Sequence, residues 1–97
     1  MTVYVMAHVH ITDREGFGEY AQRFGATLAP FGGRVIVVAD DPDVLEGEWP
    51  AGRTVVLAFD DAATARAWWE SEAYQEISAL RRAASTSAMM VAPGWEP

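Results

Sequence analysis

Four short stretches of the chain are rich in apolar and β-branched residues and predict four β-strands, the first of them by a clear period of two. In residues 3–11, small or β-branched residues occupy the odd positions, and tyrosine, methionine and histidine occupy the even ones. The other strands are predicted at residues 34–39, 53–59 and 86–92. Between the second and third lies an acidic connection, residues 40–52, in which we expect a short edge strand at 44–49.

Two stretches instead repeat apolar residues at helical spacing. Thr12-Asp13-Arg14-Glu15 fits a capping box with Thr12 as N-cap, and the helix it opens ends at Pro30 and Gly32-Gly33. Its apolar stripe is Phe17, Tyr20, Ala21, Phe24 and Leu28. Asp60-Asp61 offers an N-cap for a helix through Trp68 and Trp69, one expected in the core and the other at its rim. Ser71 is expected to cap one or two further turns.

The resulting order, β-α-β-β-α-β, predicts one α+β domain over residues 1–97 with a ferredoxin-like fold. Right-handed crossovers place both helices on one face of a four-stranded antiparallel sheet. The strands at 35–39 and 55–59 are nevertheless apolar at nearly every position, which is typical of strands buried on both faces. We therefore expect a second copy of the chain to cover the other face in a homodimer.

The amino-acid composition excludes several kinds of active site and partner. The chain has no Cys, Lys or Asn, and 7 basic residues face 14 acidic ones, for a net charge of −7. Thiol nucleophiles, disulfides, thiolate metal sites and Schiff-base lysines are thereby excluded. The scattered arginines form no basic stripe, so no nucleic-acid partner is expected. No secretory signal and no apolar run of about 18 residues is present, which predicts a cytoplasmic protein without membrane contact.

Five residues are candidates for binding a ligand. His8 is the best candidate for a proton-transfer group, because it shares the even-numbered face of the first strand and points away from the helices. Arg34, at the start of the second strand, is placed to bind a carboxylate or to pair with an acid of the chain. The other three candidates are Trp49, Tyr74 and Arg81. Each also has a possible role without a ligand: Trp49 could contact the partner chain, Tyr74 could cap a backbone group, and Arg81 could interact with the helix dipole.

Other polar groups carry weaker signals. His10 lies near the end of its strand, where a structural role is expected. The acidic connection lacks the order of a calcium loop, and the two histidines have no third ligand at a suitable spacing, so no metal site is predicted. No Gly-x-Ser-x-Gly motif marks a nucleophilic serine.

The sequence resembles the DUF1330 family from about residue 3 to residue 91. The resemblance is carried by Tyr4-Val5-Met6-Ala7-His8-Val9, Thr12-Asp13, Phe31-Gly32-Gly33-Arg34, Leu45-Glu46-Gly47-Glu48-Trp49, Ala65-Arg66-Ala67-Trp68-Trp69-Glu70-Ser71, Tyr74-Gln75 and Arg81. It implies a dimeric α+β barrel, in which two ferredoxin-like protomers join through their sheets, and it implies no activity. Where the family usually has Ser-Pro-Glu-Tyr, this chain has Ser71-Glu72-Ala73-Tyr74.

Three functions remain open at this point. The first is a homodimer that binds a small organic ligand between sheet and helices or at the dimer interface. The second is a cofactor-free oxygenase or isomerase that uses His8 for proton transfer. Fold-mates that oxygenate without a cofactor rely on an Asn-Trp-His set, which disfavours the oxygenase since the chain has no Asn. The third is a structural dimer module with no ligand. No cofactor is expected, since both histidines lie on a strand and haem-binding fold-mates use a helical histidine.

Overall fold

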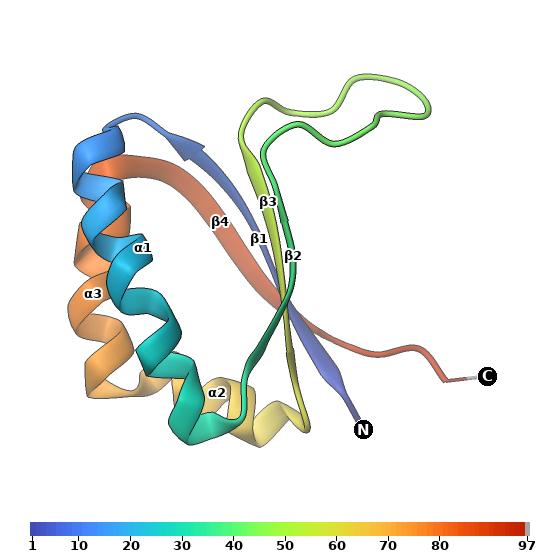
Figure 1. Cartoon of the computed structure of the whole chain (residues 1–97). Coiled ribbons are helices and arrows are strands. Elements are labelled where there is room, and N and C mark those ends of the chain that lie inside the picture. Colours follow the sequence, from blue (N-terminus) through green and yellow to red (C-terminus); the bar gives the residue numbers. More distant parts are fainter. Residues whose placement is uncertain (97) are drawn as a thin grey trace.

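A computed structural model describes residues 1–96 and shows a four-stranded antiparallel sheet with helices on one face (Figure 1). The order in the sheet is β2-β3-β1-β4, so that β2 and β4 form the edges. The elements, in chain order, are β1 (Val3–Ile11), α1 (Arg14–Leu28), the short 3₁₀ helix η1 (Ala29–Phe31), β2 (Arg34–Ala39), β3 (Arg53–Phe59), α2 (Ala62–Glu70), α3 (Glu72–Ala84) and β4 (Ser85–Pro93). This confirms the ferredoxin-like α+β fold.

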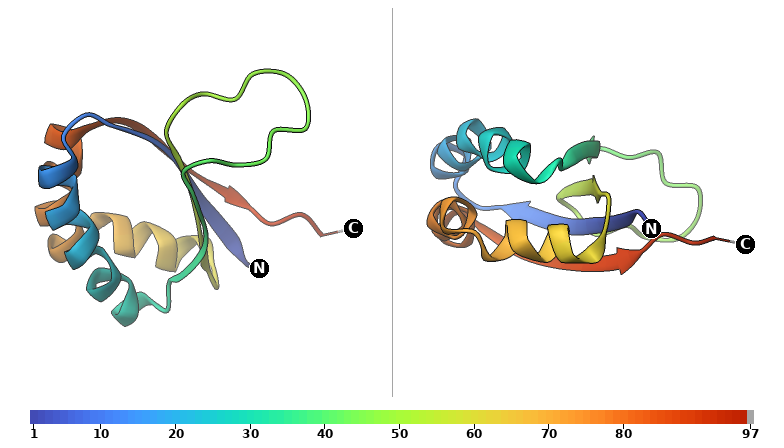
Figure 2. Two further views of the ribbon diagram at one scale, coloured as in Figure 1. Left: turned by 45° about the horizontal axis from the view of Figure 1, so that its top comes forward. Right: turned by 90° about the horizontal axis from the view of Figure 1, so that it is seen from below.

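The central strand β1 divides the two faces of the sheet as its alternation predicts. Val3, Val5, Ala7 and Val9 are all less than a tenth exposed and face the helices. Met6, between them, is 41% exposed on the opposite face, called here the open face. The views in Figure 2 show α1 and α3 side by side on the covered face and the 40–52 loop extending away from them.

An aromatic cluster joins the helices to the sheet. The Trp68 ring is fully buried, and its centroid lies 4.2 Å from that of Tyr74 and 5.4 Å from that of Phe59. Trp68 Nε1 also donates a hydrogen bond to Thr27 Oγ1 at 3.1 Å. Trp69, by contrast, is only partly buried. The expectation of one tryptophan in the core and one at its rim is therefore confirmed.

Three local predictions need correction, the first at the start of α1. Asp13, not Thr12, is the N-cap, because its side chain accepts from the Gly16 amide at 3.2 Å. The Thr12 amide instead donates to the Ala84 carbonyl at 2.8 Å, which ties the β1–α1 turn to the end of α3. The expected capping box is absent because the helix begins one residue later than it requires.

Ser71 caps a further helix as expected, and the second correction concerns the length of that helix. Ser71 ends α2, with its amide donating to the Trp68 carbonyl, and its hydroxyl accepts from the Tyr74 amide to begin α3. Its extended backbone, with ψ of 146°, separates the two helices. Because α3 then runs for 13 residues rather than one or two turns, the observed order is β-α-β-β-α-α-β.

The third correction is that residues 44–49 form no strand. Pro42 and Pro50 lack amide donors, and Gly47 has a positive φ of 77°, which breaks an extended conformation. The loop is instead closed at its base and exposed at its tip, where Leu45 is 94% exposed.

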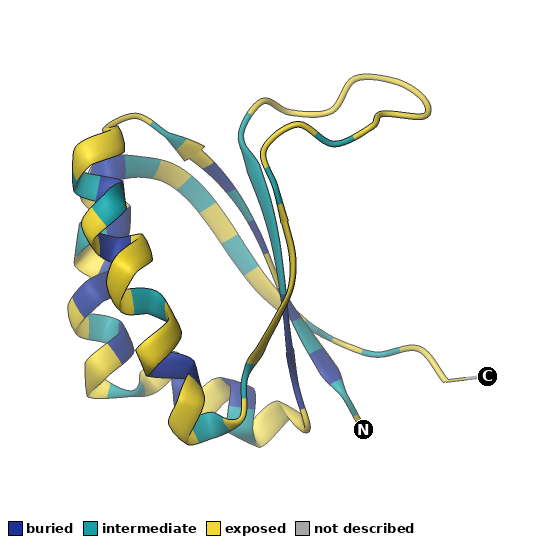
Figure 3. Cartoon of the chain, in the orientation of Figure 1, coloured by how far each residue is buried: buried dark blue, intermediate teal, exposed yellow. Residues whose placement is uncertain are grey.

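One strand stays uncovered on both sides. In β2, Val35 and Val38 face the helix side and Val37 faces the open side, yet all three are at least 39% exposed. Figure 3 shows this exposure along β2, where the helices do not reach the sheet edge. A single chain therefore leaves the apolar residues of β2 in contact with water.

Candidate functional site

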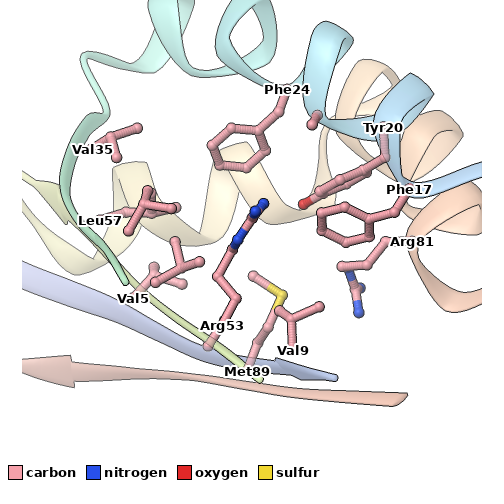
Figure 4. A pocket seen from close by; sticks show the side chains of 14 residues that line it. Val5, Val9, Phe17, Tyr20, Phe24, Val35, Arg53, Leu57, Arg81 and Met89 are labelled. Atoms are coloured by element: carbon pink, nitrogen blue, oxygen red, sulfur yellow. The ribbon is translucent and has the colours of Figure 1, made fainter. Parts of the chain in front are cut away.

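The sheet, α1 and α3 line a cavity of about 190 Å³ that is partly open to solvent and mostly apolar. Every layer of the fold contributes to it (Figure 4). From α1 come Phe17, Tyr20, Ala21 and Phe24; from the strands come Val5, Ala7, Val9, Val35, Val38, Val55, Leu57 and Met89; the two charged groups are Arg53 and Arg81. A concave apolar space with a few polar groups is the usual form of a small-molecule site.

Arg81 is the most buried charged residue of the site. It lies in α3 and is only 5% exposed. Its Nη1 donates to Ser87 Oγ on β4 at 2.6 Å, while its Nε is buried and has no hydrogen-bond acceptor among residues 1–96. A buried N–H without an acceptor is unusual in a folded protein and marks this side chain for attention.

Two tyrosines and a methionine continue the polar part of the lining. The Tyr20 and Tyr74 hydroxyls are 2.9 Å apart, and Tyr74 donates on to Met89 Sδ at 3.6 Å. Burial raises the pKa of Tyr20 far above its ordinary value, and the neighbouring Tyr74 raises it further, whereas Arg81 opposes the shift. Tyr20 is therefore a neutral hydroxyl at physiological pH, and because Tyr74 donates to Met89, Tyr20 donates its proton to Tyr74.

Arg53 stands where β3 begins, and its charge is already balanced. Its Nε and Nη2 donate to the two carboxylate oxygens of Asp40 at 2.6 and 3.1 Å, which closes the base of the 40–52 loop. The guanidinium carbon also lies 5.6 Å from the centroid of the Phe17 ring. The hydrogen bonds from Arg53 lower the pKa of Asp40, and the same pair raises the pKa of Arg53.

The lowered pKa of Asp40 makes a pH-dependent contribution to stability. Because the folded-state pKa lies below the ordinary 3.8, the ion pair stabilises the protein above that pH and is lost as the pH falls through the lowered value. Asp40→Asn is expected to reduce the free energy of unfolding at pH 7 by less than about 1 kcal/mol, since the pair is exposed to water. Urea unfolding of both proteins from pH 7 to pH 3 should show this difference shrink only below pH 4.

Asp43→Asn is the matched control for that measurement. Asp43 lies in the same loop and forms no ion pair within the described part of the chain. A pH-dependent loss in Asp43→Asn as large as in Asp40→Asn would show that general loop charge, not the Arg53 pair, causes the effect.

The five residues predicted as ligand-binding do not meet at one site. Arg81 lines the cavity on the covered face, and the Tyr74 hydroxyl bonds to a lining tyrosine. On the open face, His8 and Trp49 border a separate apolar hollow, where His8 Nε2 lies 3.3 Å from the Pro50 carbonyl oxygen. Arg34 lies at the sheet edge and pairs with Asp60 at 3.1 Å.

Two lining residues were not among the predicted candidates, although the pattern contains a signal for each. Arg53 precedes Val55 and Leu57 at a spacing of two, which places a charged residue on the helix-facing side of β3. Tyr20 interrupts the apolar stripe of α1 with a hydroxyl. In both cases, a polar side chain at a position that the pattern predicts to be buried was the signal for a site.

Residues 1–96 meet neither of two simple structural criteria, one for membrane-spanning helices and one for metal-ligand clusters. None of the helices there has both the length and the apolar character needed to cross a membrane. Within the same residues, no three histidine or acidic side chains gather closely enough to hold a metal ion.

Solved structures share this fold at low sequence identity. A protein of unknown function from Rhodopseudomonas palustris superposes with a TM-score of 0.80 and 16% identity, covering 99% of this chain and 84% of its own. A dimeric ferredoxin-like protein of unknown function from a Jannaschia species superposes with a TM-score of 0.72 and 11% sequence identity. The superposition covers 97% of this chain and 100% of that protein. SnoaB, a cofactor-independent oxygenase from Streptomyces nogalater, superposes with a TM-score of 0.62 and 15% sequence identity. The superposition covers 99% of this chain and 95% of SnoaB.

Sequence comparison assigns the chain to a family but to no known activity. A search of curated proteins finds no match to this chain. Residues 2–95, by contrast, match the family described as "Domain of unknown function (DUF1330)". The match spans almost the whole chain and agrees with the resemblance of its motifs, so the protein belongs to the DUF1330 family.

Proposed function

We propose that the protein is a homodimer that binds a small organic molecule in the cavity between its sheet and its helices. The observation that carries the proposal is the cavity itself, about 190 Å³ of mostly apolar space at which Arg81 and the Tyr20 hydroxyl are placed. A packed structural module would fill this space with side chains. The cavity therefore favours a binding protein over the purely structural dimer.

The open face of the sheet supports the dimer. Met6, Val37 and Met90 expose between 39% and 53% of their surface there, and the strand register places Met6 beside both Val56 and Met90. A continuous apolar face of this kind is uncommon on a soluble monomer. A second copy is the fitting partner, because a two-fold axis makes one apolar face complementary to itself. The Jannaschia neighbour, described as dimeric, supports the same assembly.

Catalysis is the second candidate function, favoured by the structural likeness to SnoaB, which is described as a cofactor-independent oxygenase. A reaction that uses His8 would take place on the open face, since His8 does not line the cavity. A molecule in the cavity would instead meet Tyr20 and Arg81. Ligand binding in the cavity therefore does not require the His8 chemistry.

The test is an amide NMR titration with single-ring compounds, both neutral and anionic, for which benzamide, benzoate, phenylacetate and cyclohexanecarboxylate are suitable probes. We expect saturable shifts at residues that line the cavity. Ala21→Phe, which places a ring at the cavity wall, should weaken them, whereas Ala26→Phe on the exposed side of α1 should not. Absence of cavity shifts with all four compounds, or equal binding by both variants, would contradict the proposal.

A further inference from the structure

Arg81 is the one buried charged residue among residues 1–96, and it has no acidic partner there. Arg23, Arg34 and Arg53 pair with Glu76, Asp60 and Asp40, and the three arginine side chains are 26–50% exposed. Arg81 is far more buried, yet no carboxylate of residues 1–96 lies within ion-pair distance of it. A buried cation is normally paired, because removing a charge from water is costly.

The nearest polar groups do not neutralise this charge. Ser87 Oγ accepts from Nη1, but a hydroxyl carries no negative charge, and Nε has no acceptor in the described structure. Tyr20 is also neutral, because burial raises its pKa more than Arg81 lowers it. Arg53, at the same cavity, is already neutralised by both oxygens of Asp40. Arg81 is therefore the cation of the cavity that lacks a negative partner.

The apolar space beside Arg81 has room for a small apolar group. Its volume, about 190 Å³, is slightly larger than the roughly 150 Å³ cavity that holds benzene in another protein. Figure 4 shows the rings of Phe17, Tyr20 and Phe24 around this space, with the Arg81 guanidinium at the same end as Phe17 and Tyr20. One ring, or an aliphatic group of similar size, fits the apolar part.

We infer that the ligand is a single-ring organic acid whose carboxylate binds Arg81 and whose ring lies against the aromatic side chains of α1. The planar guanidinium fork matches the two oxygens of a carboxylate. This inference rests on the proposed binding function and adds the charge and size of what is bound.

Calorimetric titration with benzoate and with its neutral counterpart benzamide tests the inference. The wild-type protein is expected to bind benzoate about tenfold more tightly than benzamide, because only benzoate pairs with Arg81. Arg81→Met keeps the length of the side chain but removes its charge, and should weaken benzoate binding about tenfold while benzamide binding changes by less than about twofold. Arg82→Met, the exposed neighbour on the same helix, is the control with the same net charge and should behave as wild type.

The outcomes separate this inference from the function on which it rests. The inference of an acidic ligand is wrong if benzamide binds as tightly as benzoate, or if Arg81→Met and Arg82→Met weaken benzoate binding equally. The proposed binding function is unaffected by either result. If neither compound binds, the inference fails, and the binding proposal fails as well when the NMR titration shows no cavity shifts with any of its four compounds.

Thermal unfolding gives a second readout that also reports folding. Without ligand, Arg81→Met should unfold at the same or a higher temperature than wild type, since it removes an unpaired buried charge. Benzoate should raise the wild-type midpoint and raise that of Arg81→Met by a smaller amount at the same concentration. A lower midpoint of Arg81→Met without ligand would show that the charge is already compensated within the protein, which would overturn the inference.

Discussion

Replacing Trp68 with alanine is expected to lower the free energy of unfolding by about 3–5 kcal/mol. Trp68 is fully buried, contacts the rings of Tyr74 and Phe59, and donates a hydrogen bond to Thr27. Its removal leaves a large cavity and deprives the Thr27 hydroxyl of a donor, although that hydroxyl still donates to the Phe24 carbonyl. Since a chain of this length has a total stability of about 5–15 kcal/mol, the loss would be a major fraction of it.

Trp95→Ala is the matched control, because Trp95 is 86% exposed. It should change the unfolding free energy by less than about 0.5 kcal/mol. Both variants and the wild type are compared by urea unfolding at one fixed protein concentration, since dimerisation would make the midpoint depend on concentration. If Trp68→Ala cost no more than Trp95→Ala, the aromatic cluster would not be the centre of the core.

The strands could be read from the sequence because burial enforces alternation locally. On β1 the odd residues are buried against the helices, so their pattern in the sequence follows directly from the fold. The helix boundaries depended on which of several adjacent residues makes a cap. Thr12 and Asp13 are both suitable N-caps by residue type, and in the structure the amides of both donate to the Ala84 carbonyl while the Asp13 side chain makes the cap.

The candidate site was harder to predict, for a similar reason. His8, Arg34, Trp49, Tyr74 and Arg81 have the right side chains for ligand binding, but alternation alone does not show where a cavity remains after packing. It correctly placed His8 away from the helices. The meeting of Arg81 with Tyr20 depends on how α1 and α3 pack together, and no local pattern in the sequence records that contact.

Replacing Met6 with glutamate is expected to dissociate the proposed homodimer. Met6 lies on a central strand of the open face, between Val56 and Met90. In a sheet-to-sheet dimer, the variant would bury a carboxylate from each copy, and each copy already carries a charge of −7. Loss of about 3 kcal/mol of association energy would weaken the dimer about a hundredfold. The fold of each chain should persist, because Met6 is 41% exposed in the single protomer.

Sedimentation or light scattering over a range of concentrations measures the effect. The wild type should have about twice the 10.6 kDa mass of one chain, and Met6→Glu should approach that single-chain mass as it is diluted. Ala26→Glu adds the same charge to the exposed surface of α1 and should remain dimeric, with circular dichroism confirming that both variants are folded. A wild type of single-chain mass at micromolar concentration would contradict the homodimer. A Met6→Glu variant that stays dimeric as firmly as Ala26→Glu would place the interface elsewhere, and the apolar open face would then need a different partner.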